Sequence, residues 1–140
     1  MPRFEHTVTI NRNLVDVFRA ATDFNSLHTW QSGVSKVNVI SGEPVRPGTM
    51  VSIQRGGLFI NADVMEFQRN KVVTMQGVWG RFRFVWTQEF QSSARETTIK
   101  DKLDIHTGWL YFWYAPILGM RVNSQLHTDR AALKKQLENT

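Results

Sequence analysis

The segment GWLYFWYAPILGM at residues 108–120 decides how this chain is interpreted, because its apolar run could form a membrane anchor, a core strand or the rim of a cavity. The run covers 109–118 and contains a proline. A helix that crosses a bilayer needs about 20 apolar residues, so a membrane anchor is excluded. Pro116 suits the first turn of a helix. We therefore expect the segment to join a last strand to a C-terminal helix.

The residues before this segment form a series of short blocks in which apolar and polar side chains alternate. Alternation with a period of two predicts strands that are buried on one face. We expect strands at 4–10, 34–40, 49–54, 58–67, 72–79, 81–91 and 95–106. Because the breaks between the last six are short, these strands should form an antiparallel meander.

Two short helices are expected after the first strand, and one long helix at the end of the chain. Asn13 is a good N-cap with Asp16 three residues later, and Asp23 precedes a second helical stretch that runs toward Trp30. The long helix should bury one apolar side, with Asp129 and Arg130 at its edge. This side consists of Gly119, Val122, Leu126, Leu133 and Leu137.

A run of strands followed by a helix predicts an α+β fold in which the helix covers the apolar face of the sheet. A curved seven-stranded antiparallel sheet around a long C-terminal helix leaves an interior that side chains need not fill. A ligand cavity is therefore expected between them. The 140 residues contain no internal repeat or linker, and we expect one domain over 1–140.

Charge and cysteine content exclude some classes of function. The net charge is +5 and the sequence pI is about 10.0, but the basic residues are scattered and no RNA-binding motif accompanies them. No nucleic-acid partner is therefore expected. The chain has no cysteine, which excludes disulfides and thiolate chemistry. The N-terminal residues carry no secretory signal, and we expect a cytoplasmic protein.

Several stretches, in this order, carry a resemblance to a known group of proteins. They are HTVTINRNLVDVFRAATDFNSLHTW, GEPVRPGTMV, DVMEFQRNKVVTMQG, FRFVWTQEFQ and APILGM with LKKQLE. Over nearly its whole length the chain resembles the START-related helix-grip superfamily (SRPBCC), and within it the polyketide cyclase/dehydrase branch. The resemblance implies a helix-grip fold around a cavity for an apolar or amphipathic small molecule. It leaves the chemistry open, because relatives include cyclases as well as lipid and hormone carriers.

The lining of the cavity can be predicted from the alternation. Phe82, Phe84, Trp86 and Gln88 share one face of their strand, and this aromatic face should point inward. The run 109–118 is interpreted as the rim of the cavity, with plain packing or a contact between two copies as alternatives. The candidate ligand contacts are His6, Trp30, Arg55, Met75, Trp79, Phe82, Phe84, Trp86, Gln88, Leu103, Trp109, Leu118, Val122 and Leu126.

Asp101 stands at the centre of an apolar row in the last strand. Because burial disfavours a charged carboxylate, Asp101 is expected either to titrate high or to have a cationic partner. It is the candidate general acid or base of a cyclase, and the alternative is a structural ion pair. Arg55 is the natural partner to consider, provided that the row of Val51 and not the row of Met50 faces inward.

His6 shares the inward row of the first strand and suits proton transfer near neutral pH, although a single histidine in such a row is typical of a core residue. No two histidines, and no histidine and acid, have the spacing of metal ligands. No metal and no cofactor is therefore expected.

Three functions are compatible with these features. The leading hypothesis is the binding of a small hydrophobic molecule, aromatic or polycyclic, in a cavity between the sheet and the C-terminal helix. The alternatives are a polyketide cyclase, aromatase or dehydratase that uses Asp101, and a lipid shuttle whose aromatic rim and positive charge make a transient contact with a membrane surface. Oligomerisation through 109–118 is left open.

Overall fold

The structure is a computed structural model that describes residues 3–31, 34–40, 45–55, 58–79, 82–106 and 115–139. Within these ranges the elements follow the order that the sequence predicts. They are β1 (Arg3–Ile10), α1 (Leu14–Thr22), the 3-10 helix η1 (Phe24–Thr29), β2 (Val34–Val39), β3 (Met50–Arg55), β4 (Leu58–Gln68), β5 (Val72–Trp79), β6 (Phe82–Ser93), β7 (Glu96–His106) and α2 (Ala115–Glu138).

The described strands form one seven-stranded sheet in the order β1-β7-β6-β5-β4-β3-β2. Every neighbouring pair is antiparallel, so β2 to β7 are a meander and β1 closes the far edge against β7. The register shifts once within β2–β3 and once within β4–β5. Such bulges bend a strand and increase its twist, which suits a sheet that curves around a helix.

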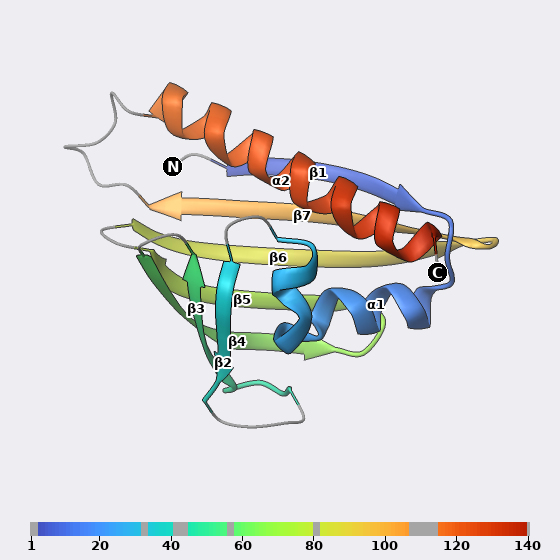
Figure 1. Cartoon of the computed structure of the whole chain (residues 1–140), viewed down its shortest axis with the longest axis horizontal. Helices are drawn as coiled ribbons and strands as arrows, with labels where there is room; N and C mark the ends of the chain where they lie inside the picture. Colours follow the sequence, from blue (N-terminus) through green and yellow to red (C-terminus); the bar gives the residue numbers. More distant parts are fainter. Residues whose placement is uncertain are drawn as a thin grey trace.

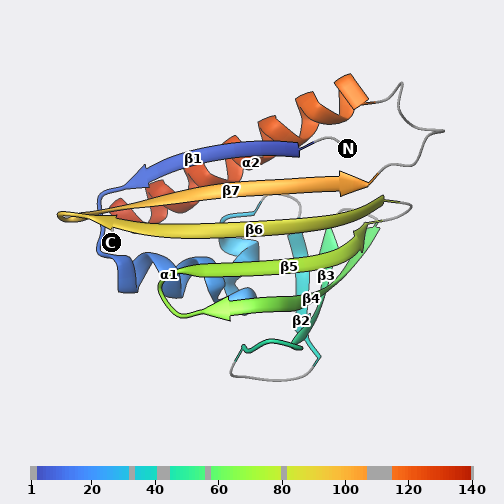
Figure 2. The same ribbon diagram turned by 180° about the vertical axis from the view of Figure 1, so that it is seen from behind.

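All the helices lie on one face of the sheet. Figure 1 shows α2 running obliquely across the strands, with α1 and η1 beside it on the same side. In the view from behind, the strands stand in front of the helices (Figure 2). The expected α+β helix-grip architecture, with a curved sheet wrapped around a long C-terminal helix, is confirmed.

The ends of the expected strands agree with the structure to within two residues. In β3 the choice between two rows is settled, because Val51 and Ile53 are buried and Met50 is 52% exposed. Asn13 caps α1 as expected, since its Oδ1 accepts a hydrogen bond from the backbone N–H of Asp16 at 2.9 Å. Asp23 differs from expectation: it precedes η1, but its carboxylate accepts from the hydroxyl of Ser26 instead of capping a backbone N–H.

The larger core cluster lies where α1 and the C-terminal half of α2 meet the sheet. Leu133 is fully buried there, and the ring of Phe18 makes edge contacts with Phe67 and Phe90 at 5.5 and 4.9 Å between ring centroids. A separate and smaller cluster lies under the N-terminal half of α2, around Ile105 and Val122. Phe84 packs against both clusters.

The structure describes only part of the apolar segment 108–120. Helix α2 begins at Ala115, which places Pro116 in its first turn as expected. Residues 107–114, among them Trp109, and the side chains of 115–119, among them Leu118, lie outside the described parts of the chain. The interpretation of 109–118 as a cavity rim or oligomer contact therefore stays a prediction. Among the described helices, none combines the length and the apolar character needed to cross a bilayer.

Candidate ligand-binding cavity

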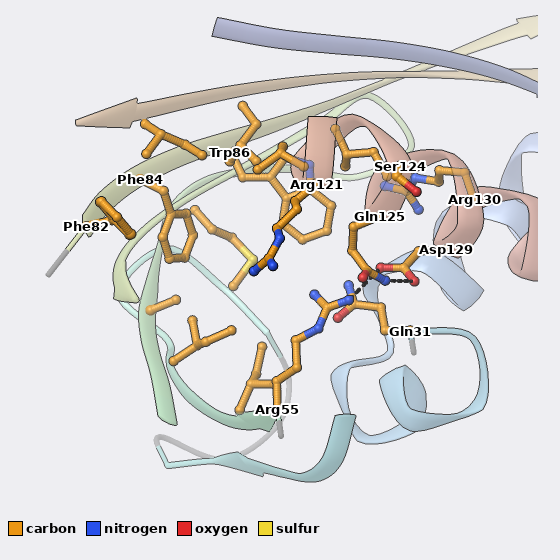
Figure 3. A pocket seen from close by; sticks show the side chains of 18 of the residues that line it. Gln31, Arg55, Phe82, Phe84, Trp86, Arg121, Ser124, Gln125, Asp129 and Arg130 are labelled. Carbon is orange, nitrogen blue, oxygen red and sulfur yellow. Dashed lines mark hydrogen bonds and ion pairs between the residues drawn. The ribbon is translucent and has the colours of Figure 1, made fainter. Parts of the chain in front are cut away.

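A cavity of about 680 Å³ lies between the concave face of the sheet and the N-terminal half of α2 (Figure 3). Strands β3 to β7 supply one wall, and α2, with two residues at the end of η1, supplies the other. Its lining consists of Trp30, Gln31, Ile53, Arg55, Ile60, Ala62, Met75, Phe82, Phe84, Trp86, Leu103, Ile105, Met120, Arg121, Val122, Ser124, Gln125, Leu126, Asp129 and Arg130. Met120 is 75% exposed, so the cavity opens beside the start of the described part of α2.

The sheet wall is apolar and aromatic because the inward rows of adjacent strands come into register. Met75 lies opposite Trp86, and Gly77 opposite Phe84. A Cβ at Gly77 would overlap the backbone of β4 and would lie 2.8 Å from Cζ of Phe84. Glycine is therefore needed at this position for the Phe84 ring to lie against β4 and form part of the wall.

The helix wall is polar at the edge that faces β3. Arg55 Nη2 donates to Asp129 Oδ2 at 3.3 Å, and Gln125 Nε2 donates to Asp129 Oδ1 at 2.7 Å. Figure 3 shows this chain of contacts crossing from β3 to α2. The ion pair is largely shielded from water, with side-chain exposures of 22% for Arg55 and 9% for Asp129. It ties the edge of the sheet to the helix at one side of the cavity.

Arg130, which lines the cavity, forms a buried ion pair with Asp101, which lies behind the wall. Arg130 Nε donates to Asp101 Oδ2 and Nη2 donates to Oδ1, both at 2.8 Å. Nη2 also donates to Gln88 Oε1 at 2.6 Å, and Trp86 Nε1 donates to Asp101 Oδ1 at 2.9 Å. The side chains of Asp101 and Arg130 are 0% and 1% exposed. A bidentate ion pair of this kind compensates the carboxylate charge, which burial alone would strongly disfavour.

The cationic partner that the sequence led us to expect for Asp101 is thus present, but it is Arg130 and not Arg55. Arg55 faces inward and lines the cavity, but its carboxylate partner is Asp129. Arg130 was placed at the edge of the apolar stripe of α2, whereas the structure buries it in that stripe. The guanidinium carbon of Arg130 lies 5.2 Å from the ring centroid of Trp30 and 5.6 Å from that of Trp86. Both distances are within the range of a cation–π interaction.

A few buried polar atoms have no hydrogen-bond partner in the described residues. They are His6 Nδ1, Trp30 Nε1, Gln88 Nε2 and Arg130 Nη1. All are nitrogens, and two of them belong to residues that line the cavity, Trp30 and Arg130. The side of the cavity where η1 approaches α2 therefore contains N–H groups that lack an acceptor.

His6 lies away from the cavity, at the contact between β1 and α2. Its Nε2 is 3.4 Å from Nδ1 of His127, and the two rings meet edge to face. Burial lowers the pKa of His6 from the ordinary value of 6.5, against the opposing effect of nearby Asp101, while His127 and Arg130 lower it further. Among the described residues no three histidines and acids come close enough to hold a metal ion.

The predicted ligand contacts separate into three groups. Those that line the cavity are Trp30, Arg55, Met75, Phe82, Phe84, Trp86, Leu103, Val122 and Leu126. His6, Gln88 and the candidate acid Asp101 do not line it; the last two are fully buried behind the wall. For Trp79, Trp109 and Leu118 the side chains lie outside what the structure describes.

Sequence reasoning missed most of the polar lining on α2. Arg121, Gln125 and Asp129 recur every four residues and so share a helix face, next to the apolar stripe that was identified. Arg130 comes four residues after Leu126 and three before Leu133, which is the spacing of the stripe itself. That spacing is the signal that could have placed Arg130 inside the protein.

Comparison with known proteins agrees with this geometry. The model of the family described as "Polyketide cyclase / dehydrase and lipid transport" matches residues 1–138. The chain belongs to this family. The resemblance to the START-related helix-grip superfamily is thereby confirmed. Among curated protein sequences no significant match is found.

Solved structures show the same family fold at low sequence identity. A protein from Mesorhizobium loti has a TM-score of 0.82 at 14% identity, with 99% of this chain and 98% of that chain covered. A START superfamily protein from Mycobacterium smegmatis has a TM-score of 0.79 at 13% identity, with 98% and 97% covered. The Aha1 dimer from Colwellia psychrerythraea has a TM-score of 0.74 at 17% identity, with 99% and 97% covered. At such identities the likeness shows the fold alone. Family and fold together fit a protein that binds a hydrophobic ligand or acts like a polyketide cyclase.

Proposed function

We propose that this protein binds a small hydrophobic molecule with aromatic rings in the cavity between its sheet and α2. The observation that carries the proposal is the cavity itself, about 680 Å³ and walled by Phe82, Phe84, Trp86 and Met75. Ligand pockets typically have about 300–1,000 Å³ and a mostly apolar lining with a few polar groups. Aromatic walls favour ring systems, because rings can stack with an offset or meet edge to face.

The hydrogen bonds of the two carboxylates in and behind the cavity wall, Asp129 and Asp101, favour a binding protein over an enzyme that transfers protons. Both oxygens of Asp101 accept hydrogen bonds from Arg130, and Asp101 lies behind the wall. Both oxygens of Asp129 accept as well, one from Gln125 and one from Arg55. We therefore assign Asp101 a positioning role: it holds Arg130 and the indole of Trp86, both of which line the cavity. The cyclase and membrane-shuttle alternatives have no such observation in their favour.

The first test is native mass spectrometry of the protein purified from its own host, under gentle and under denaturing conditions. A discrete bound mass that disappears on denaturation is expected, and it would reveal the chemical class of the ligand. A second test titrates a panel of neutral aromatic and polycyclic compounds by calorimetry. The proposal fails if the purified protein carries no ligand and no compound in the panel binds saturably.

A matched pair of variants locates the binding. Ala62 lines the cavity and is 6% exposed, whereas its neighbour Asn61 points to the outer face of the same strand. Ala62→Phe should project a ring into the cavity and weaken binding by at least about tenfold, the equivalent of 1.4 kcal/mol. Asn61→Phe should leave the affinity unchanged. Thermal unfolding of both variants checks that they are folded, and Met75→Trp, on the neighbouring strand, provides a second way to fill the cavity. Wild-type affinity in a folded Ala62→Phe variant would refute the location.

A further inference from the structure

The charges around the cavity do not balance. Among the described residues, three arginines and one aspartate line it. Arg55 is paired with Asp129, and Arg130 with Asp101 behind the wall. Arg121 has no hydrogen-bond or ion-pair partner within the described residues. Within the part of the chain that the structure describes, one positive charge at the cavity is therefore left without a carboxylate.

Arg121 is placed so that a ligand can reach it. It follows Met120 on α2 and is exposed, and it lines the cavity together with the aromatic wall. In Figure 3 its side chain extends from α2 into the cavity, and its guanidinium group lies between Trp86 and Arg55. Because Arg121 is exposed, water hydrates its guanidinium group when no ligand is bound. An anion bound there would replace part of this hydration by charge-assisted hydrogen bonds.

Two buried nitrogens on this side of the cavity do not contribute to such a contact. Trp30 Nε1 and Arg130 Nη1 have no hydrogen-bond partner in the described residues, but both atoms are shielded from solvent within the wall. The exposed guanidinium of Arg121, in contrast, can be reached from the cavity. A guanidinium group is a donor only and carries a positive charge, which suits a ligand that carries oxygen acceptors and a negative charge.

We infer that the natural ligand is an aromatic acid, with its rings against Phe84 and Trp86 and its carboxylate on Arg121. This inference rests on the proposed function and specifies the class of ligand. A carboxylate is preferred to a phosphate because, among the described lining residues, one guanidinium is unpaired, and a single negative charge balances it. The planar donors of arginine also match the two oxygens of a carboxylate.

The test compares two probes that share a ring system and differ in charge, 2-naphthoate and 2-naphthamide. Calorimetry at neutral pH and low salt should show tighter binding of the naphthoate to the wild-type protein. The expected preference is about five- to tenfold, because the pair is partly exposed and therefore partly screened. Raising the salt concentration should reduce the preference without affecting the naphthamide.

Three variants assign the preference to a residue. Arg121→Gln should bind both probes equally, and Arg121→Lys should keep part of the preference because lysine retains the charge but not the planar donors. Arg83→Gln is the matched control, because Arg83 is an exposed arginine on the outer row of β6. This control should behave as the wild type.

The outcomes separate this inference from the proposed function. Equal binding of the two probes by the wild type, or an undiminished preference in Arg121→Gln, overturns the inference and leaves the proposed function standing. If neither probe nor any other aromatic compound binds saturably, both are overturned.

Discussion

Replacing Arg130 by methionine should destabilise the protein more than any exposed substitution, because it leaves the Asp101 carboxylate buried without a cation. Arg130 makes two hydrogen bonds to Asp101 and one to Gln88, at 2.6–2.8 Å. Its side chain is 1% exposed and that of Asp101 is 0% exposed, so water cannot take over these contacts. Breaking a buried pair from one side costs about 3–5 kcal/mol. A domain of this size has about 5–15 kcal/mol in total, so the variant should fold with a small margin.

The double variant Asp101→Leu/Arg130→Met, compared with the two single variants, measures the interaction energy between the two side chains. Replacing a whole buried pair by apolar side chains is often neutral or stabilising by about 1–4 kcal/mol. In this protein Trp86 Nε1 and Gln88 Oε1 would lose their partners, at a cost of about 1–3 kcal/mol each. We therefore expect the double variant to be at least as stable as Arg130→Met alone, with a coupling energy of at least about 3 kcal/mol.

The assay is equilibrium unfolding in urea at neutral pH, followed by far-ultraviolet circular dichroism so that changes around Trp86 do not distort the signal. Lys102→Gln is the control, because it breaks the Lys102–Glu89 pair, whose side chains are 28% and 44% exposed. The free energy of unfolding of this control should fall by less than about 1 kcal/mol. Two results would refute the role of the buried pair. One is a loss of unfolding free energy below about 1 kcal/mol in Arg130→Met, and the other is a double variant whose loss equals the sum of the two single losses.

Three further predictions concern the stability of the fold. Burial lowers the pKa of His6 below 6.5, so the unfolded chain binds this proton more tightly and stability should fall as the pH drops below about 6.5. His6→Gln should flatten the dependence of the urea midpoint on pH between about 7.5 and 5.5. A variant of the exposed His106 is the control and should keep the wild-type dependence. An unchanged pH dependence in His6→Gln would be evidence against a stabilising role of neutral His6. Gly77→Ala should cost about 1–3 kcal/mol by overpacking against β4 and Phe84, and a wild-type melting temperature would contradict that geometry. Asn13→Ala removes the cap of α1 and should cost about 1 kcal/mol in urea unfolding, most of which Asn13→Ser should restore; equal losses in the two variants would argue that the cap is not the cause.

Much of the cavity could be predicted from local pattern. In β6 the alternation of aromatic with non-aromatic residues predicted that Phe82, Phe84 and Trp86 face inward, and all three line the cavity. The stripe on α2 likewise predicted Val122 and Leu126 as lining residues. These predictions succeed because the period of a strand or helix decides which side chains share a face, whatever the element packs against.

The pairing of charges could not be derived in this way. Asp101 could be recognised as a buried carboxylate from its apolar row, but its partner is 29 residues away on α2. Arg55, which was considered for that role, pairs with Asp129, 74 residues away. Which arginine meets which aspartate depends on where α2 crosses the sheet, and no local pattern contains that information.

The sequence by itself therefore determined the elements, their order, the curved antiparallel sheet and the aromatic side of the cavity, because each follows from the periodicity of a single segment or from short connections. Only the tertiary structure decided that Arg130 neutralises Asp101 and that Arg121 enters the cavity without a partner among the described residues. The physical reason is that alternation and helical spacing are properties of one element, whereas an ion pair or a cavity requires two elements to be docked at a particular position and angle.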